Sequence, residues 1–316
     1  ICDAELGALA ARWQKVRDSS LGGAPAGGAV LVTGPPGSGK SMLAQRLAGL
    51  LPALSQQQAL ESAAMLSLAG QFQPARWAQP AYRHPHHSAT MAALVGGGVP
   101  PRPGEISLAH HGVLFLDELA EVKRSALEAL REPLENGHIT ISRAATQAKF
   151  PARFQLISAM NPCPCGYLGS PLKACRCTPD QVARYQGKLS GPLLDRIDLH
   201  IEVPSQNAAH LINAPIGDST AVLKARCHRA RNLAMARQGC PNQSLGGPSL
   251  DHHTALDDNA KAYITQVAQH FAWSGRSTHR VLKIARTIAD LADSLPIETQ
   301  HIAEAVQYRR PVVGHR

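Results

Sequence analysis

The sequence is poor in aromatic residues, which make up 4% of its 316 residues, so we expect hydrophobic cores built mainly from leucine, alanine, isoleucine and valine. No apolar run approaches the ~20 residues that a membrane-spanning helix needs, which argues against a membrane partner. The opening residues, Ile1 to Glu5, lack the basic and then apolar pattern of a secretory signal. An initiator methionine is also missing, and we expect the sequence to be a fragment of a longer protein.

Acidic residues are fewer than basic ones, 23 against 32, which gives a net charge of +9 and a pI near 9.4. This excess favours a polyanionic partner such as nucleic acid, although a basic protein without such a partner has the same composition. The seven cysteines are an odd number without a secretory signal. They favour a reducing, cytoplasmic location, where clustered cysteines indicate metal binding more than disulfides.

The length and the hydrophobic pattern predict two domains. Short apolar runs typical of strands buried on both faces lie at residues 29–32, 113–116, 154–159 and 198–203. Helical spacing runs from Leu119 to Gly137. After about residue 205 the strand patterns stop, and helices are predicted at 219–238, 257–272, 277–294 and 297–309. The predicted fold is an α/β domain with a central parallel sheet over 1–205, which has an insertion at about 71–104, followed by a smaller all-α domain over 206–316. A short helix is also predicted at 3–17.

A glycine-rich loop lies between the first predicted strand and a helix, and it reads Gly34-Pro35-Pro36-Gly37-Ser38-Gly39-Lys40-Ser41. Such a loop directs backbone N–H groups towards a phosphate, and the helix N-terminus adds its positive dipole end. We expect Lys40 to reach the β- and γ-phosphates of a nucleoside triphosphate and the Ser41 hydroxyl to bind Mg²⁺. A chance glycine turn would give the same residues, but eight matches in this context make it a poor explanation.

Polar residues end two of the later predicted strands. Asp117 is expected to hold Mg²⁺ with the phosphate loop, and Glu118 to act as a general base towards the attacking water. Asn161 ends the next strand and could hydrogen-bond the same water or the γ-phosphate. A surface acidic pair and an ordinary Asn-Pro turn are the simpler alternatives.

Two arginines are candidates for contact with the transferring phosphoryl group. Arg196 precedes the last predicted strand and could project into the nucleotide of a neighbouring subunit, or could form an ion pair with Asp195 or Asp198. Arg276 opens a helix of the second domain and could reach the γ-phosphate. Arg280 and Arg286 on the same helix compete for that role, and a solvated basic face is the alternative for all three.

Three further groups suggest binding sites. Cys163, Cys165, Cys175 and Cys177 match the ligand count of a structural tetrahedral Zn²⁺ site, although the C-x-C spacing is tight and free thiols are equally open. His86 and His87 are expected to make hydrogen bonds or contact the substrate rather than bind metal. A predicted hairpin at about 138–153 carries Arg143, Lys149 and Arg153 and could grip a polyanion, or could simply be exposed to solvent.

Together these motifs resemble the ComM/YifB branch of the magnesium-chelatase-like AAA+ ATPases over about residues 30 to 310. The segments specific to that branch are Pro85-His86-His87-Ser88 and Pro162-Cys163-Pro164-Cys165-Gly166-Tyr167. Members usually carry a Lon-like domain upstream, and their approach to the phosphate loop reads Gly-His-Asn where this sequence has Ala26-Gly27-Gly28-Ala29.

The resemblance implies a hexameric ring that uses ATP and Mg²⁺ to drive branch migration of single-stranded or branched DNA during natural transformation. At the matching positions it implies that Lys40 and Ser41 belong to the phosphate loop, Asp117 and Glu118 to the second nucleotide motif, Asn161 to the polar sensor, Arg196 to the finger and Arg276 to the lid sensor. Remodelling of a protein partner is the alternative. A switch that binds ATP without hydrolysing it is disfavoured by Glu118.

Overall fold

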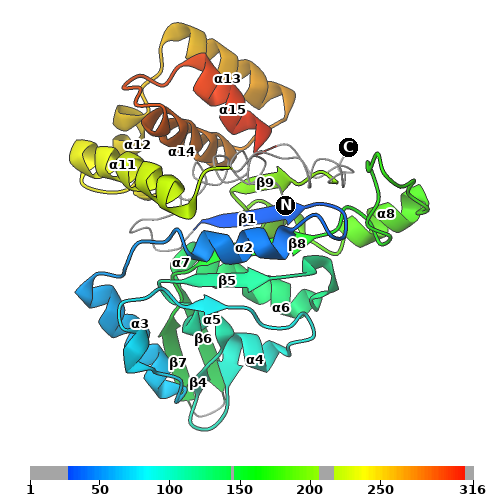
Figure 1. The fold of residues 1–316 in the computed structure, drawn as a ribbon, viewed down its shortest axis with the longest axis vertical. Helices are drawn as coiled ribbons and strands as arrows, with labels where there is room; N and C mark the ends of the chain where they lie inside the picture. The colour runs from blue at the N-terminus through cyan, green and yellow to red at the C-terminus, as the bar shows by residue number, and fades with distance from the viewer. Residues whose placement is uncertain (1–27, 144–145, 206–216, 310–316) are drawn as a thin grey trace. The chain divides into compact units, whose positions relative to one another are not determined.

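The computed structural model describes residues 28–143, 146–205 and 217–309 of the chain (Figure 1). The helix predicted at residues 3–17 lies outside this part. The described residues divide into two compact units: an α/β unit from within 28–197 and 201–205, and a helical unit of 198–200 and 217–309. The α/β class and the helical C-terminal region predicted from the sequence are therefore confirmed.

The α/β unit is built on a five-stranded sheet in the order β2-β5-β8-β1-β9. The pairs β2·β5, β5·β8 and β8·β1 are parallel. The strands are β1 (Ala29–Thr33), β2 (Tyr82–Arg83), β5 (Val113–Leu116), β8 (Gln155–Met160) and β9 (Leu199–Glu202). Every residue of β1 and β5 is buried, as expected for strands covered on both faces. Strands that come later in the chain lie on both sides of β1, with β8 on one side and β9 on the other. Open α/β sheets bind ligands at the ends of strands where the strand order reverses in this way.

Short helices and loops surround this sheet. They are α2 (Lys40–Ala48), α3 (Gln56–Leu68), η1 (Pro74–Arg76), α4 (Met91–Val95), α5 (Glu105–Leu108), η2 (Leu119–Glu121), α6 (Arg124–Ala129), α7 (Arg131–Asn136), α8 (Pro179–Gln186) and α9 (Gly191–Leu194), with a small ladder of β3 (Gly96–Gly97) and β4 (Arg102–Pro103). One core cluster joins the sheet to these elements and includes Leu31, Leu94, Ile106, Leu127 and Leu156.

The helical pattern between Leu119 and Gly137 is broken into η2, α6 and α7. The backbone is extended at Val122 and Lys123, where ψ is 137° and 133°. Pro133 lies in the first turn of α7, where its missing N–H removes no helical hydrogen bond. The apolar residues still face one core, so spacing alone could not reveal the interruptions.

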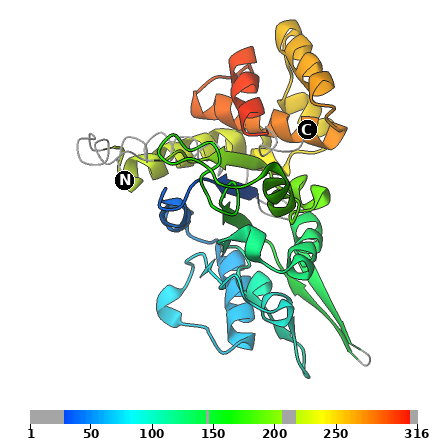
Figure 2. The ribbon, with the colours of Figure 1, turned by 90° about the vertical axis from the view of Figure 1, so that its right-hand side faces the viewer.

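The predicted hairpin consists of β6 (His138–Arg143) and β7 (Thr146–Pro151), an antiparallel pair that extends away from the central sheet (Figure 2). Ile139 pairs with Phe150, and both are buried in the main core. Lys149 pairs with Thr140 and is exposed. One face of the hairpin therefore anchors it, and the other is open to solvent.

The helical unit contains α11 (Thr220–Gln238), η3 (Asn242–Ser244), α12 (Pro248–His253), α13 (Asp258–His270), α14 (Gly275–Leu291) and α15 (Thr299–Gln307). Ser219, Asp257 and Ser274 cap α11, α13 and α14 by accepting backbone N–H hydrogen bonds. The four predicted helices are present, and α12 was not predicted. Among the described helices, none has the length and hydrophobicity needed to cross a bilayer.

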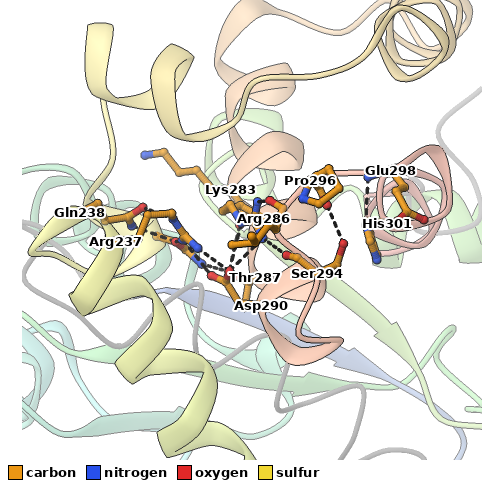
Figure 3. A network of polar contacts seen from close by, with 12 residues as sticks. Arg237, Gln238, Lys283, Arg286, Thr287, Asp290, Ser294, Pro296, Glu298 and His301 are labelled. Carbon is orange, nitrogen blue, oxygen red and sulfur yellow. Dashed lines mark hydrogen bonds and ion pairs between the residues drawn. The ribbon is translucent and has the colours of Figure 1, made fainter.

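A buried polar network centred on Asp290 joins these helices (Figure 3). Its carboxylate accepts two hydrogen bonds from Arg237, at 2.6 and 2.9 Å, and others from Asn242 at 2.7 Å and Arg286 at 3.1 Å. Arg286 also donates to the carbonyl oxygens of Ser294 and Leu295. The network ties α11 and η3 to the C-terminal half of α14.

Candidate nucleotide-binding site

The phosphate loop connects β1 to α2 and requires glycine at three positions. A Cβ on Gly34 would lie 2.5 Å from the carbonyl oxygen of Val203, so the backbones approach too closely for a side chain. Gly37 and Gly39 have φ of +77° and +85°, the left-handed region in which glycine is unstrained. Gly39 caps α2, so the loop delivers the chain directly to a helix N-terminus.

Lys40 is held over the loop. Its Nζ donates to the carbonyl oxygens of Gly34 and Pro35, at 2.8 Å each, and to Oδ1 of Asn161 at 3.2 Å. Burial lowers the pKa of Lys40, and the nearby Asp117 carboxylate partly opposes this effect. The ammonium group is thus held next to the loop by two backbone carbonyl oxygens and one side-chain amide oxygen.

Ser41 and Asp117 come from different elements and meet in the site. The Ser41 hydroxyl donates to Oδ2 of Asp117 at 2.6 Å. Asp117 directly follows β5, and its Oδ1 accepts the backbone N–H of Glu118 at 2.9 Å. A hydroxyl and a carboxylate in contact form the oxygen donor set that Mg²⁺ binds next to nucleotide phosphates.

Glu118 has a positive φ of 50°, which is unusual for a residue with a Cβ. One oxygen of its carboxylate, Oε2, lies 2.8 Å from Nδ1 of His87, and its side chain is 53% exposed. Strained backbone of this kind gathers at active sites, where it fixes the direction of a side chain. Glu118 is therefore exposed, and its carboxylate lies against His87.

His87 was not predicted as a partner of Glu118, but strand register explains the contact. Arg83 pairs with Leu114 in the parallel ladder of β2 and β5, and His87 and Glu118 each lie four residues further on. The neighbouring His86 instead contacts the Ser88 hydroxyl, at 2.8 Å. The expected hydrogen bond is therefore present for His86, and His87 contacts Glu118.

Two residues test whether a phosphate group fits this loop. Asn161 follows β8, and the Met160 carbonyl accepts the N–H of Gly34 at 3.2 Å, so Asn161 lies beside the loop. The Ser38 hydroxyl is buried and finds no hydrogen-bond partner in the described part of the chain. An unpaired buried hydroxyl is costly unless a ligand supplies a partner. Phosphate oxygens would do so, and the site therefore fits a nucleotide.

Arg196 lies two residues beyond α9 and is paired within its own chain. Its guanidinium forms an ion pair with Glu135 and donates to the carbonyl oxygen of Pro192 at 2.6 Å. Its side chain is 10% exposed. The partner is Glu135 of α7, which the sequence did not indicate.

The three arginines of α14 differ in their surroundings. Arg276 lies in the first turn of the helix and is exposed. Arg280 contacts Asp198 at 3.3 Å. Arg286 is buried in the Asp290 network, and its burial lowers its pKa. Arg286 is therefore committed to the interior of the helical unit.

The four cysteines gather in one place. Sγ of Cys163 lies 3.4 Å from that of Cys165 and 3.7 Å from that of Cys175, and all four sulfurs lie within 4.8 Å of one another. Backbone N–H groups of Arg176 and Tyr167 lower the pKa of the Cys165 thiol to about 6. Nothing here shows a metal, but the donor set is compatible with a structural zinc ion.

A second histidine and carboxylate cluster, which the sequence did not reveal, lies on the α/β unit. Nε2 of His110 and Nε2 of His111 lie 3.3 and 2.6 Å from the same Glu61 oxygen. Nδ1 of His110 accepts the N–H of Arg153 at 3.0 Å, so Nε2 of the neutral ring carries the proton. A protonated nitrogen cannot bind metal, and we interpret the cluster as a hydrogen-bonded link between α3 and the start of β8.

The basic residues expected on the hairpin are spread over its length. Lys149 is exposed on β7, and Arg153 is exposed beyond the end of that strand. Arg143 ends β6, but its side chain lies outside the described part of the structure. A polyanion-binding role for these residues stays a prediction.

The sheet carries a glycine loop after β1, an acidic pair after β5 and Asn161 after β8, the strand between them. Together with the helical unit that follows, this arrangement defines an AAA+ nucleotide-binding protein. The chain belongs to the magnesium chelatase subunit ChlI family. The model of that family matches residues 14–211, and the model of the ChlI C-terminal region matches residues 217–309. Membership implies ATP and Mg²⁺ as the species bound.

Three relatives show how far the similarity extends. The chain is 48% identical over 282 residues to the uncharacterized protein YifB of Escherichia coli, 46% over 285 residues to the competence protein ComM of Haemophilus influenzae, and 42% over 289 residues to the uncharacterized protein Rv2897c of Mycobacterium tuberculosis. These alignments cover 89–90% of the chain but only 55–57% of the relatives. The resemblance to ComM/YifB-type proteins is therefore confirmed, and the chain spans little more than half the length of the relatives.

Proposed function

We propose that this chain is the ATP-hydrolysing core of a DNA motor that promotes branch migration during natural transformation. The meeting of Lys40, Ser41, Asp117, Glu118 and Asn161 in one site carries the hydrolysis part of this proposal. The name of the Haemophilus relative, a competence protein, and the net charge of +9 support the DNA part.

Each side chain in the site has a distinct task in hydrolysis. Lys40 binds the β- and γ-phosphates, and Ser41 and Asp117 hold Mg²⁺, which neutralises phosphate charge when it is bound. Glu118 accepts the proton of the attacking water as its oxygen bonds to the γ-phosphorus and the bond to the β-phosphate oxygen breaks. Asn161 orients the water or the phosphate through its amide.

Two arginines complete the proposed site. Arg196 acts in the nucleotide site of the next subunit of a homo-oligomeric, hexameric ring, which makes hydrolysis depend on assembly. Arg276 is the proposed lid sensor, because it is exposed in the first turn of α14, whereas Arg286 is buried. An exposed arginine in the first turn of a helix can reach a ligand without disrupting a core.

The hairpin is the proposed DNA contact, through Arg143, Lys149 and Arg153. A family named for a chelatase subunit also supports a second candidate, an ATPase that remodels a protein partner. The two candidate functions predict different effects of DNA and of salt on ATP hydrolysis. Only a DNA motor should respond to DNA, and its response should weaken steeply with salt, because contacts with DNA phosphates release counterions.

The test compares ATP hydrolysis by the chain with and without single-stranded or four-way DNA, at several salt concentrations. A DNA motor should be stimulated by DNA at low salt, and Lys149→Ala should reduce the stimulation while leaving basal hydrolysis unchanged. Lys261→Ala, which removes an exposed lysine of α13, is the matched control. If DNA does not bind at low salt, the motor assignment is wrong and the remodelling candidate remains.

A further inference from the structure

The distances among three of the sulfurs, and the place of the fourth, match a single tetrahedral metal site. The sulfurs of Cys163, Cys165 and Cys175 lie 3.4, 3.6 and 3.7 Å apart, close to the ~3.8 Å edge of a ZnS₄ tetrahedron with Zn–S bonds of about 2.3 Å, and that of Cys177 lies within 4.8 Å of them. They are too long for a disulfide, which needs about 2.05 Å. The sulfurs of two C-x-C segments thus lie together in one cluster.

Backbone N–H groups point at the sulfurs as well. The N–H of Cys165 donates to Sγ of Cys177, and the N–H of Cys177 donates to Sγ of Cys175, at 3.4 Å each. Such donors stabilise thiolates and orient metal ligands. Binding of Zn²⁺ to four thiolates would release the thiol protons and leave a net charge of −2 on the site.

The cysteine cluster is in contact with the phosphate loop. A Cβ built on Gly166, the residue after Cys165, would lie 2.5 Å from Cδ of Pro36 and 3.6 Å from Cγ of Asn161. Gly166 has φ of +83°, and its N–H donates to the carbonyl oxygen of Cys163 at 3.0 Å. The turn that carries two of the sulfurs therefore packs against the loop and against the polar sensor.

A second contact fixes the same segment from the other side. Nε2 of Gln186, a buried residue of α8, donates to the carbonyl oxygen of Pro162 at 3.0 Å. Asn161 thus precedes a segment held by α8 and by the cysteine cluster. Release of the sulfurs would free the chain two residues after Asn161.

We propose that Cys163, Cys165, Cys175 and Cys177 bind one Zn²⁺, and that this zinc acts as a positioning element that holds Gly166 against Pro36 and Asn161 in its working place. The metal is structural, because four thiolates leave no open coordination position. The inference rests on the proposed nucleotide site, to which it adds control by metal occupancy.

The first experiment measures zinc in the purified chain by elemental analysis. We expect one zinc per chain, lost in Cys163→Ser and in Cys175→Ser and kept in Cys240→Ser, a matched control in the helical unit. Removal of zinc by a chelator under reducing conditions should lower basal ATP hydrolysis at least tenfold, and added Zn²⁺ should restore it. Absence of zinc, or iron in its place, would overturn the metal assignment.

The second experiment separates the contact from the metal. Gly166→Ala and Gly169→Ala both place a side chain at positive φ, +83° and +74°, but only the first meets Pro36. We expect both to retain zinc, and Gly166→Ala alone to lower basal ATP hydrolysis about tenfold or more and to weaken binding of a fluorescent ATP analogue. Equal effects of the two substitutions would overturn the coupling. The readouts need no DNA, and Lys40→Ala tests the nucleotide site separately.

Discussion

Nδ1 of His87 lies 2.8 Å from Oε2 of Glu118, so an imidazole ring contacts the carboxylate proposed as the general base. The two residues follow neighbouring parallel strands, and each lies four positions beyond the paired residues Arg83 and Leu114. Glu118 also has a left-handed backbone conformation. Strand register and local backbone thus set the direction of this carboxylate together.

His87→Ala should lower kcat for ATP hydrolysis about tenfold, because Glu118 would lose the ring that contacts its carboxylate and helps to orient it. The affinity for ATP should stay within about twofold, since His87 does not belong to the phosphate loop. Steady-state hydrolysis and equilibrium binding of a fluorescent ATP analogue measure the two effects. His86→Ala, which removes a ring bonded to Ser88, should behave like the unsubstituted chain. A similar loss in both variants would show that the effect is not specific to Glu118.

Arg196→Ala should leave ATP binding intact and reduce hydrolysis by about 10³-fold or more, as expected for loss of an arginine finger. Mixing it with Lys40→Ala should restore part of the activity, because a mixed ring contains sites with both an intact loop and an intact arginine. Hydrolysis by the mixture is measured against each variant alone.

Glu135→Gln controls for the ion pair that Arg196 makes within its own chain. This substitution removes the pair and keeps the arginine, so hydrolysis should change little. If Glu135→Gln is as inactive as Arg196→Ala, the ion pair is needed for folding of the α/β unit. If Glu135→Gln is active but the mixture of Arg196→Ala and Lys40→Ala recovers no hydrolysis, Arg196 does not act in the neighbouring subunit.

The phosphate loop and the acidic pair were predictable because each is a short segment whose context, strand then polar turn, is visible in the sequence. The contact between His87 and Glu118 could not be predicted, because β2 has only two residues and is too short to show the alternation of polar and apolar residues that marks a strand. The sequence also did not show that Arg276 is exposed and Arg286 is buried. They lie on one helix, and burial of Arg286 depends on Arg237 and Asp290, which only the packing of α11 against α14 brings together.

Asp290→Asn should destabilise the helical unit by about 3–5 kcal/mol, because it leaves the cations of Arg237 and Arg286 partly buried without their counterion. The side chains of Asp290 and Arg286 are 2% and 3% exposed, so solvent cannot replace the lost charge. Chemical denaturation followed by circular dichroism measures the change. Asp258→Asn, at an exposed position of α13, should cost less than about 1 kcal/mol. Comparable losses in both variants would contradict a stabilising role for the network.

His110 should make the free energy of unfolding depend on pH between about 6.5 and 4. Burial, and then the neighbouring His111, lowers its pKa to about 4, whereas in the unfolded chain the pKa is near 6.5. Within this window the unfolded chain binds more protons, so stability falls as the pH falls and levels off below pH 4. The full loss is about 3 kcal/mol, since each pKa unit corresponds to about 1.4 kcal/mol.

His110→Asn should flatten the stability profile between pH 6.5 and 4.5, since the asparagine oxygen can accept the Arg153 N–H without titrating. His111→Asn is the matched control. It removes the hydrogen bond that contributes most to lowering the pKa of Glu61 to about 2. Stabilisation from Glu61 is complete above about pH 4.5 and is lost as the pH falls through 2, so His111→Asn should act mainly below pH 4.5. Above pH 4.5 it should reduce the slope only in part, because burial, the largest cause of the lowered pKa of His110, remains. Unfolding at a series of pH values separates the two windows. An unchanged slope above pH 4.5 in His110→Asn would mean that another group titrates there.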